Sequence, residues 1–159
     1  MCLKKLVKWK EKPYLSPENT DMNVWLWFRR TFTAISKARQ KELRPYGISL
    51  PESAVLYVVH ELNNRVTPTE ISRQLLTDIH SISQLLVRME NRGLLRRVKD
   101  FPRKNMIRVA LTRKGREIRK QAIAGETMTN IMSDLSESEK KQFLSYLSKM
   151  RSKAMNILH

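Results

Sequence analysis

The stretch from Thr67 to Thr112 constrains the fold of this 159-residue chain more than any other part of its sequence. It opens with Thr-Pro-Thr-Glu, which has the form of a capping box. In such a box the Thr67 hydroxyl accepts the N–H of Glu70, and the Glu70 carboxylate reaches back to the N–H of Thr67. Pro68 loses nothing at the first helical position, where its missing N–H would have no partner. The pattern therefore predicts a short helix that begins at Pro68.

A second helix is predicted directly after a break at residues 76–78. Thr77 or Asp78 can cap it, and Gly93 ends it because glycine enters the left-handed conformation without a steric penalty. Its apolar residues recur at helical spacing and form one stripe to be buried: Ile79, Ile82, Leu85, Leu86 and Met89. The opposite face is left to meet a partner, and it carries His80, Ser81, Ser83, Gln84 and Arg88.

The period of the pattern changes after Gly93. Residues 94–98 form a short run rich in branched side chains, and residues 106–111 alternate, with Ile107, Val109 and Leu111 on one face. A polar loop that contains Pro102 joins the two runs, so we expect a β-hairpin. Two helices with a tight turn and a following hairpin predict a winged helix-turn-helix, a fold that places its second helix in the DNA major groove.

The rest of the chain is predicted to be helical, which makes the fold class mainly α with a small β-hairpin (α+β). We expect helices over residues 21–43 and 50–62, one continuous helix over 113–135, and a last helix over 137–158. Ser49 with Glu52, and Ser136 with Glu139, repeat the capping-box spacing. The last helix has apolar residues at alternating steps of four and three, the spacing of a helix that packs along another helix: Phe143, Leu147, Met150, Ala154 and Ile157.

The charge of the chain bears on its partner. There are 31 Lys+Arg against 15 Asp+Glu, a formal net charge of +16 at pH 7. Such an excess attracts polyanions, of which nucleic acid is the commonest, although a basic surface also suits RNA, a ribosome or an acidic membrane surface. The single cysteine, Cys2, excludes an internal disulfide and fits a reducing cytoplasm. The sequence has no apolar run of membrane-spanning length and no apolar core of a signal peptide, so we expect a cytoplasmic protein with no membrane partner.

Several kinds of chemistry have no signature in the sequence. The histidines at 60, 80 and 159 lack metal-ligand spacing, and four glycines in total form no phosphate-binding loop. Neither a nucleophile elbow nor a pair of carboxylates at a plausible site is present, and Cys2 has no partner thiol. We therefore expect no catalytic residue, no metal and no cofactor, and a protein that is not an enzyme.

Two runs of residues resemble the MarR family of transcriptional regulators. One is the Arg-Met-Glu-Asn-Arg-Gly-Leu-Leu sequence over residues 88–95, and the other is the Leu-Thr-x-x-Gly sequence over residues 111–115. Together with Ile-Ser-Leu-Pro at 48–51 and Thr-Pro-Thr-Glu-Ile-Ser at 67–72, they extend the resemblance over roughly residues 21–158.

The resemblance implies a homodimer whose N- and C-terminal helices interlock, and two winged domains that contact a palindromic operator in double-stranded DNA. It also implies that a small aromatic or phenolic effector releases the DNA. The corresponding organisation is a basic arm over 1–20, a dimerisation region over 21–48 and 113–159, and a DNA-binding region over 49–112. The chain departs from the family where the wing usually carries Asp-x-Arg, since Arg103-Lys104-Asn105 stands there. His80 replaces the small residue usual at the start of the recognition helix.

We expect eight side chains to contact DNA: Arg73, His80, Ser81, Ser83, Gln84, Arg88, Arg103 and Lys104. Gln can bind adenine in a bidentate way, Ser can contact a base or a phosphate, and a cationic wing suits the minor groove. The competing interpretations are a solvated helix face, a structural ion pair for Arg88, and a solvated turn for the wing.

Candidates for an effector site are Trp25, Trp27, Phe28 and His60, with core or dimer packing as the alternative reading of the aromatic residues. The expected function is that of a dimeric repressor. The alternatives are a DNA-binding or architectural protein without an effector, and a basic adaptor that binds RNA or a membrane surface.

Overall fold

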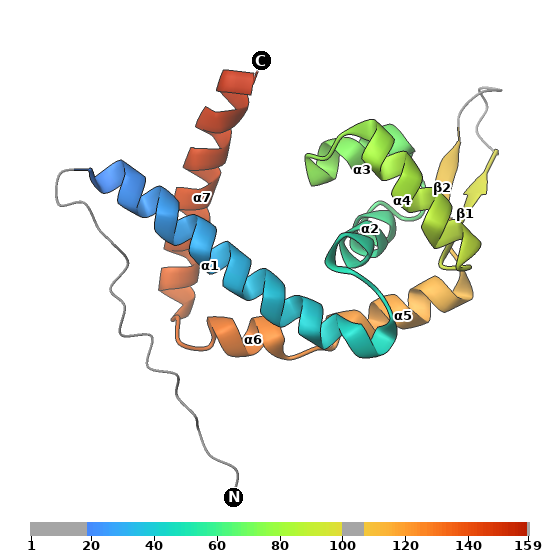
Figure 1. Cartoon of the computed structure of the whole chain (residues 1–159), viewed down its shortest axis with the longest axis horizontal. Helices are drawn as coiled ribbons and strands as arrows, with labels where there is room; N and C mark the ends of the chain where they lie inside the picture. Colours follow the sequence, from blue (N-terminus) through green and yellow to red (C-terminus); the bar gives the residue numbers. More distant parts are fainter. Residues whose placement is uncertain (1–18, 100–106, 159) are drawn as a thin grey trace, which may run out of the picture. The chain divides into compact units, whose positions relative to one another are not determined.

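The computed structural model describes residues 19–99 and 107–158. The elements are α1 (Thr20–Leu43), a short 3-10 helix η1 (Arg44–Tyr46), α2 (Leu50–Glu61), α3 (Pro68–Leu75), α4 (Ile79–Asn91), β1 (Leu95–Val98), β2 (Arg108–Leu111), α5 (Arg113–Ile123), α6 (Thr127–Met132) and α7 (Glu137–Leu158) (Figure 1). This order confirms the predicted fold class, mainly α with one β-hairpin. The chain divides at Lys37–Ala38 into two compact units, so that α1 begins in the first unit and ends in the second.

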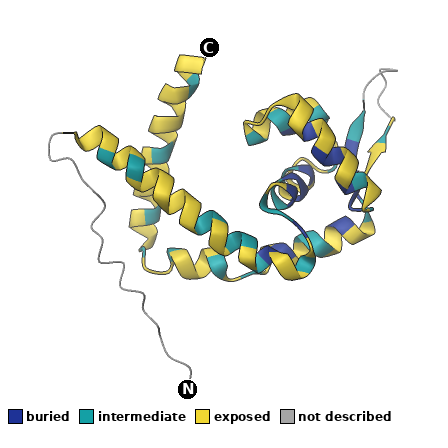
Figure 2. Cartoon of the chain, in the orientation of Figure 1, coloured by how far each residue is buried: buried dark blue, intermediate teal, exposed yellow. Residues whose placement is uncertain are grey.

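The core lies in the second unit and is formed chiefly by α2, α3, α4 and the hairpin (Figure 2). Its largest fully buried side chains are Leu43, Leu56, Ile71, Ile82, Leu86, Met89, Leu94, Leu95, Leu111, Val55, Val59 and Val66. The predicted stripe of α4 is buried with one exception. Ile79 is 38% exposed, because the first residue of the helix lies at the edge of that stripe.

Local caps form where the sequence predicted them. Thr67 N donates to Glu70 Oε2 at 2.7 Å, and Glu70 N donates to the Thr67 hydroxyl at 3.3 Å. The same reciprocal bonds join Ser49 with Glu52 and Ser136 with Glu139. Of the two residues able to cap α4, the structure uses Asp78, whose carboxylate accepts the N–H of Ser81 at 2.9 Å.

The hairpin pairs β1 with β2 in antiparallel register, from Leu95 opposite Leu111 to Val98 opposite Arg108. The predicted alternation of β2 is wrong, because Val109, Ala110 and Leu111 are all buried. β2 is an inner strand. Val109 N donates to Val66 O at 2.8 Å on the edge away from β1, while α2 and α5 pack against the strand.

The prediction of one continuous helix over 113–135 is also wrong. The chain breaks between α5 and α6 at Gly125, which approaches Glu42 so closely that a Cβ at this position would collide with the carboxylate. Glu42 Oε1 in turn accepts the N–H of Thr127 at 2.9 Å, at the first residue of α6. A carboxylate from the last turn of α1 thus holds the start of α6. No helix in the described part of the chain is long and apolar enough to cross a membrane.

Candidate nucleic-acid interface

A tight turn fixes α4 against α3. Leu76 ends α3 in the left-handed conformation, with φ of 49°, and leaves its side chain 59% exposed. The turn is closed by two bonds between the same pair of residues: Thr77 N donates to Ser72 O at 3.1 Å, and the Ser72 hydroxyl donates to Thr77 O at 2.6 Å. The start of α4 is therefore set by backbone geometry as well as by the Asp78 cap.

The Asp78 cap remains ionised. Hydrogen bonds from the side chain and the backbone of Ser81 hold the pKa of Asp78 below its ordinary value of 3.8. A carboxylate at this position also complements the partial positive charge of a helix N-terminus. The cap at the first turn of α4 therefore stays charged at neutral pH.

The predicted contact residues of α4 all lie on its exposed face: His80, Ser81, Ser83, Gln84 and Arg88. The Ser83 hydroxyl donates to Ile79 O at 2.7 Å, which leaves its oxygen as an acceptor. The side chains of Gln84 and Arg88 make no hydrogen bond or ion pair with any residue that the structure describes, so the structural ion pair considered for Arg88 does not form there. Arg73, on α3, is exposed as well.

The hairpin is tied to α4 by Arg97 of β1. Its N–H donates to Glu90 Oε1 at 2.9 Å and its Nε to Glu90 Oε2 at 2.6 Å. Partial burial acts to raise the pKa of Glu90, but the hydrogen bonds and charge of Arg97 outweigh it and hold that pKa below its ordinary value. Arg96 and Lys99 are two further exposed cationic side chains at the hairpin, and they were not among the predicted contact residues. Arg103 and Lys104 lie outside the described residues.

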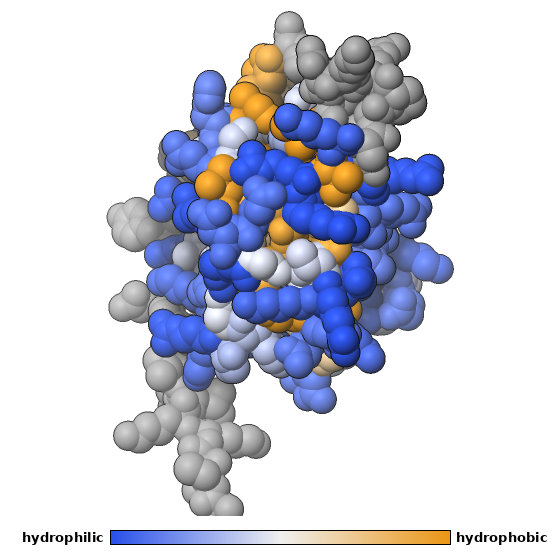
Figure 3. Space-filling view, turned by 90° about the vertical axis from the view of Figure 1, so that its right-hand side faces the viewer, coloured by the Kyte–Doolittle hydropathy of each residue, from blue (hydrophilic) through white to orange (hydrophobic). Residues whose placement is uncertain are grey.

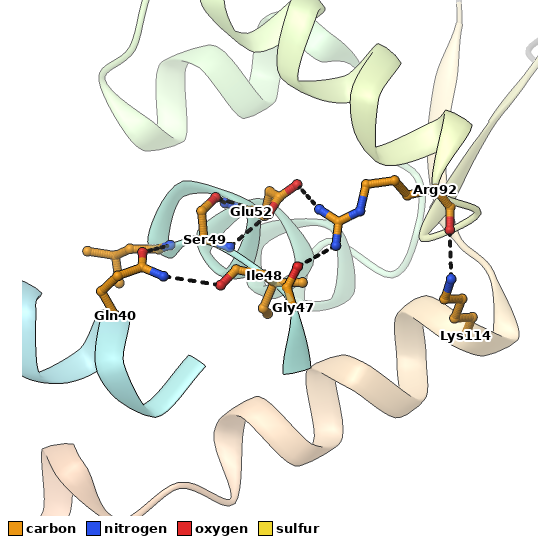
Figure 4. A network of polar contacts seen from close by, with 8 residues as sticks. Gln40, Gly47, Ile48, Ser49, Glu52, Arg92 and Lys114 are labelled. Carbon is orange, nitrogen blue, oxygen red and sulfur yellow. Dashed lines mark hydrogen bonds and ion pairs between the residues drawn. The ribbon is translucent and has the colours of Figure 1, made fainter. Parts of the chain in front are cut away.

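The other end of α4 is held by Arg92 (Figure 4). Its guanidinium donates to the buried carboxylate of Glu52 at 2.5 Å and to the carbonyl oxygen of Gly47. Its own carbonyl accepts from Lys114 Nζ at 3.0 Å. These bonds join α4 to the corner before α2 and to α5, so both ends of the recognition helix are anchored in the domain.

The exposed face of α4 is polar, and its opposite face is buried in the core. Figure 3 shows that the side bearing α4 and the hairpin is largely hydrophilic, with apolar side chains visible between the polar ones. Unpaired hydrogen-bonding groups on a rigid helix, flanked by cations, suit a major groove and its phosphates.

Comparisons with known proteins agree with this geometry. The model of the MarR family matches residues 46–100. The transcriptional regulator TtmR of Methylorubrum extorquens (strain PA1) is 25% identical over 135 residues, covering 85% of this chain and 69% of its own length. The organohalide-sensing transcriptional regulator RdhR, solved in its 2,4-dichlorophenol-bound form, is 26% identical, with a TM-score of 0.79 over 99% of this chain and 93% of its own. The MepR–DNA complex of S. aureus shares the fold, with 23% identity and a TM-score of 0.75 over 87% of this chain and 99% of that one.

Residues 46–100 of the chain thus form a domain similar to that of the MarR family.

The strand-to-helix junction that resembles the MarR family has a structural reason. The Thr112 hydroxyl accepts the N–H of Gly115 at 3.0 Å and donates to Gly93 O at 2.6 Å, so it caps α5 and fastens it to the end of α4. A Cβ at Gly115 would collide with the carbonyl of Leu94. The Leu-Thr-x-x-Gly sequence thus brings α5 into contact with the chain that leaves the recognition helix.

A cavity of about 230 Å³ lies beside the core of this MarR domain. It is lined by Arg39, Ser53, Ala54, Leu56, Tyr57, Val58, Leu75, Arg119, Ala122 and Ile123. Two arginine side chains therefore border a largely apolar space. The Nε of Arg119 is buried and has no hydrogen-bond partner in the described part of the chain, although Nη2 of the same group donates to Glu61 Oε1 at 3.3 Å.

The residues predicted for an effector site do not line this cavity. Trp25, Trp27 and Phe28 belong to the first unit and are 52%, 48% and 39% exposed, and His60 is exposed at the end of α2. No sequence pattern singles out Arg39 and Arg119, because they come from helices about 80 residues apart. Among the described residues, no group of His, Cys, Asp and Glu side chains could hold a metal ion.

The helices predicted to form a dimer expose apolar side chains. In α7, Phe143 and Met150 are each 44% exposed and Ile157 is 77% exposed, while Leu147 is half-buried. Ala154 is exposed too, and no residue of α7 is buried within the chain. In α1, Phe32 is 62% exposed. Apolar surface of this extent is typical of a protein–protein contact.

Proposed function

We propose that this transcriptional regulator, which is not an enzyme, is a dimeric repressor that binds a palindromic operator through α4 and the hairpin. The observation that carries the proposal is the exposed polar face of α4, whose opposite face is buried and whose two ends are anchored. A helix held in this way projects its side chains as a rigid set, which sequence reading in the major groove requires.

The side chains have distinct roles in the proposal. Gln84 and His80 reach base edges, and Ser81 and Ser83 contact a base or a phosphate. Arg73 and Arg88 bind phosphates on either side of the groove, because charge without a fixed partner positions the protein rather than reading sequence. Arg103 and Lys104 of the wing bind the minor groove, where narrow A·T-rich segments concentrate negative potential.

A palindromic operator has two half-sites, so the proposed function requires a dimer of two copies of the chain. We assign residues 21–48 and 113–159 to the dimerisation region, residues 49–112 to DNA binding, and residues 1–20 to a basic arm. The exposed apolar side chains of α1 and α7 support this assignment, since a partner would remove them from water. Light scattering should give about twice the 18.8 kDa mass of the chain, and a monomer at micromolar concentration would contradict the dimer.

The cavity is the proposed effector site. Its volume of about 230 Å³ lies below the roughly 300–1,000 Å³ of sites for drug-sized ligands, so it suits a molecule with a single ring. Apolar walls with two guanidinium groups favour an aromatic ring that carries a negative charge, such as a phenolate. The structural relative with bound 2,4-dichlorophenol supports a ligand of this class. Trp25, Trp27, Phe28 and His60 remain candidates for a second, separate contact with an effector.

Repression would follow from the place on the DNA where the dimer binds. A dimer bound across a promoter in the cytoplasm excludes polymerase from it. Footprinting of the DNA upstream of the protein's own and neighbouring genes tests the proposal. It should protect a symmetric region with half-sites about 10 base pairs apart or a small multiple of that distance. Absence of any symmetric footprint would contradict it, and a footprint that no single-ring acid or phenol alters would favour the effector-independent alternative.

A further inference from the structure

Arg39 is the one charged group that both lines the cavity and holds the corner between α5 and α6 within the described part of the chain. Its Nη1 donates to Glu42 Oε2, and its Nη2 donates to the carbonyl oxygen of Ala122 at 2.5 Å, near the end of α5. Glu42 uses its other oxygen to accept the N–H of Thr127 at 2.9 Å, at the start of α6. The Arg39–Glu42 ion pair is therefore bonded both to the end of α5 and to the start of α6.

The pair is shielded from water. The side chains of Arg39 and Glu42 are 15% and 17% exposed. Burial acts to raise the pKa of Glu42, but the hydrogen bonds from Thr127 and Arg39 and the charge of Arg39 outweigh it, so that this pKa lies below its ordinary value. Glu42 therefore carries a full negative charge, and it pairs with the guanidinium of Arg39, which lines the cavity.

The cavity offers a competing place for that guanidinium. Arg39 and Ala122 border it directly, and the buried Nε of Arg119 is a donor without a partner on the described chain. An anion in the cavity would lie beside the positive charge of Arg119 and supply a second negative charge for Arg39. A guanidinium has its donors in one rigid plane, so turning towards the anion moves it out of line with Glu42 and the Ala122 carbonyl.

We infer that Arg39 exchanges partners: an anionic single-ring ligand in the cavity takes the guanidinium from Glu42 and so releases the α5–α6 corner. This inference rests on the proposed function only in taking the cavity to be the effector site. An uncharged ligand of the same shape fills the cavity but leaves the Arg39–Glu42 pair intact, because it offers no charge to compete with the carboxylate.

The corner is connected to the DNA-reading helix through α5. That helix runs from the corner back to Thr112, whose hydroxyl bonds Gly93 O, and Gly115 packs on the backbone of Leu94. Lys114 of α5 also bonds the carbonyl of Arg92, the residue that caps α4 (Figure 4). A shift of α5 at its far end therefore changes the position of α4 relative to α2.

Calorimetric titration of the full-length protein without DNA tests the exchange, with 2,4-dichlorobenzoate as the charged probe and 2,4-dichlorobenzamide as its uncharged counterpart. Wild type should bind the acid at least about tenfold more tightly than the amide, since a charge-assisted hydrogen bond is lost with the charge. Arg39→Gln should weaken binding of the acid by about tenfold, and Glu42→Gln should strengthen it several-fold because the competitor is gone.

Opposite changes in affinity for the acid in the Arg39 and Glu42 variants distinguish an exchange of partners from a merely structural role of the ion pair. If both variants lose affinity for the acid to a similar extent, or if acid and amide bind wild type equally or not at all, the inference is overturned. Lys140 and Glu137 form a matched control pair, with the same spacing of three residues on α7. Lys140→Gln and Glu137→Gln should leave both affinities unchanged.

Hydrogen exchange supplies the structural readout. In wild type the acid should speed amide exchange in peptides that cover residues 123–127, whereas the amide should not. In Arg39→Gln the exchange should already be fast, and the acid should add nothing. Slower exchange at the corner in the presence of the acid would contradict release. These measurements involve no DNA. A missing operator footprint would therefore count against the proposed repressor function without deciding whether Arg39 exchanges partners.

Discussion

Replacing Arg92 by alanine should destabilise the protein far more than replacing Arg97, although both arginines form an ion pair beside α4. Arg92 pairs with Glu52, whose side chain is 9% exposed, and Arg97 pairs with Glu90, whose side chain is 31% exposed. Burial decides the difference, because a carboxylate that loses its partner away from water keeps its charge at a high desolvation cost.

The magnitudes follow from those environments. Leaving a buried neutral group unsatisfied costs about 1–3 kcal/mol and a charged group more, but the 41% exposure of the Arg92 side chain lowers the cost below that of a fully buried pair, to about 2 kcal/mol. Arg92→Ala also removes the bond to Gly47 O. The exposed pair of Arg97 should contribute less than about 1 kcal/mol. For a chain of this size, 1 kcal/mol corresponds to a change in Tm of about 2–4 °C.

Thermal unfolding at one fixed protein concentration is the assay, since the proposed dimerisation would make Tm depend on concentration. Arg92→Ala should lower Tm by about 4–8 °C and Arg97→Ala by less than about 4 °C. Raising the salt concentration should reduce the Arg97 effect more, because exposed pairs are screened. Equal shifts for the two variants, or a larger one for Arg97→Ala, would refute the reasoning that burial of Glu52 makes Arg92 the anchor of α4.

Three further outcomes are expected. Gln84→Ala should weaken operator binding by about 1–3 kcal/mol and leave binding to random DNA nearly unchanged, as measured by fluorescence anisotropy; equal losses on both DNAs would make Gln84 a phosphate contact or a bystander. The double change Arg103→Ala with Lys104→Ala should weaken binding most for operators with A·T-rich flanks and flatten the salt dependence, and an unchanged affinity and slope would show that the wing does not contact DNA. The pKa of Asp78, Glu42, Glu90 and Glu139 is lower in the folded chain than the ordinary 3.8 or 4.5, so their contribution to stability is present above those values and is lost as the pH falls below them. Tm should therefore drop below about pH 4.5, less steeply in Glu42→Gln, and an identical drop in that variant would exclude Glu42 as a contributor.

Features that depend on residues close in sequence were predictable. The three capping boxes join residues three positions apart, and the left-handed Gly93 follows from its place after a helical stripe. The choice between Thr77 and Asp78 as the cap of α4 was not fixed, because both side chains can accept the bond and only the turn geometry favours Asp78.

Features that depend on distant residues were not predictable from pattern. The break at Gly125 is set by Glu42, which lies 83 positions earlier, and the burial of Ala110 is set by α2, α5 and the pairing at Val66. The cavity shows the same limit, since Arg39 and Arg119 line one space only in the folded chain. The exposed face of α4 was predictable because one apolar stripe on a helix defines the opposite side as well.

Equilibrium competition tests the central claim, that the exposed face of α4 reads operator DNA. Labelled operator bound to wild-type protein is challenged with unlabelled operator, with scrambled duplex DNA, and with double-stranded RNA of the operator sequence, all at one stated salt concentration. The operator should compete at least about 10³-fold better than scrambled DNA, and the RNA should do no better than scrambled DNA because its deep, narrow major groove does not admit a helix. RNA that competes as well as the operator would contradict sequence reading by α4 and would favour a basic adaptor that binds nucleic acid through charge alone.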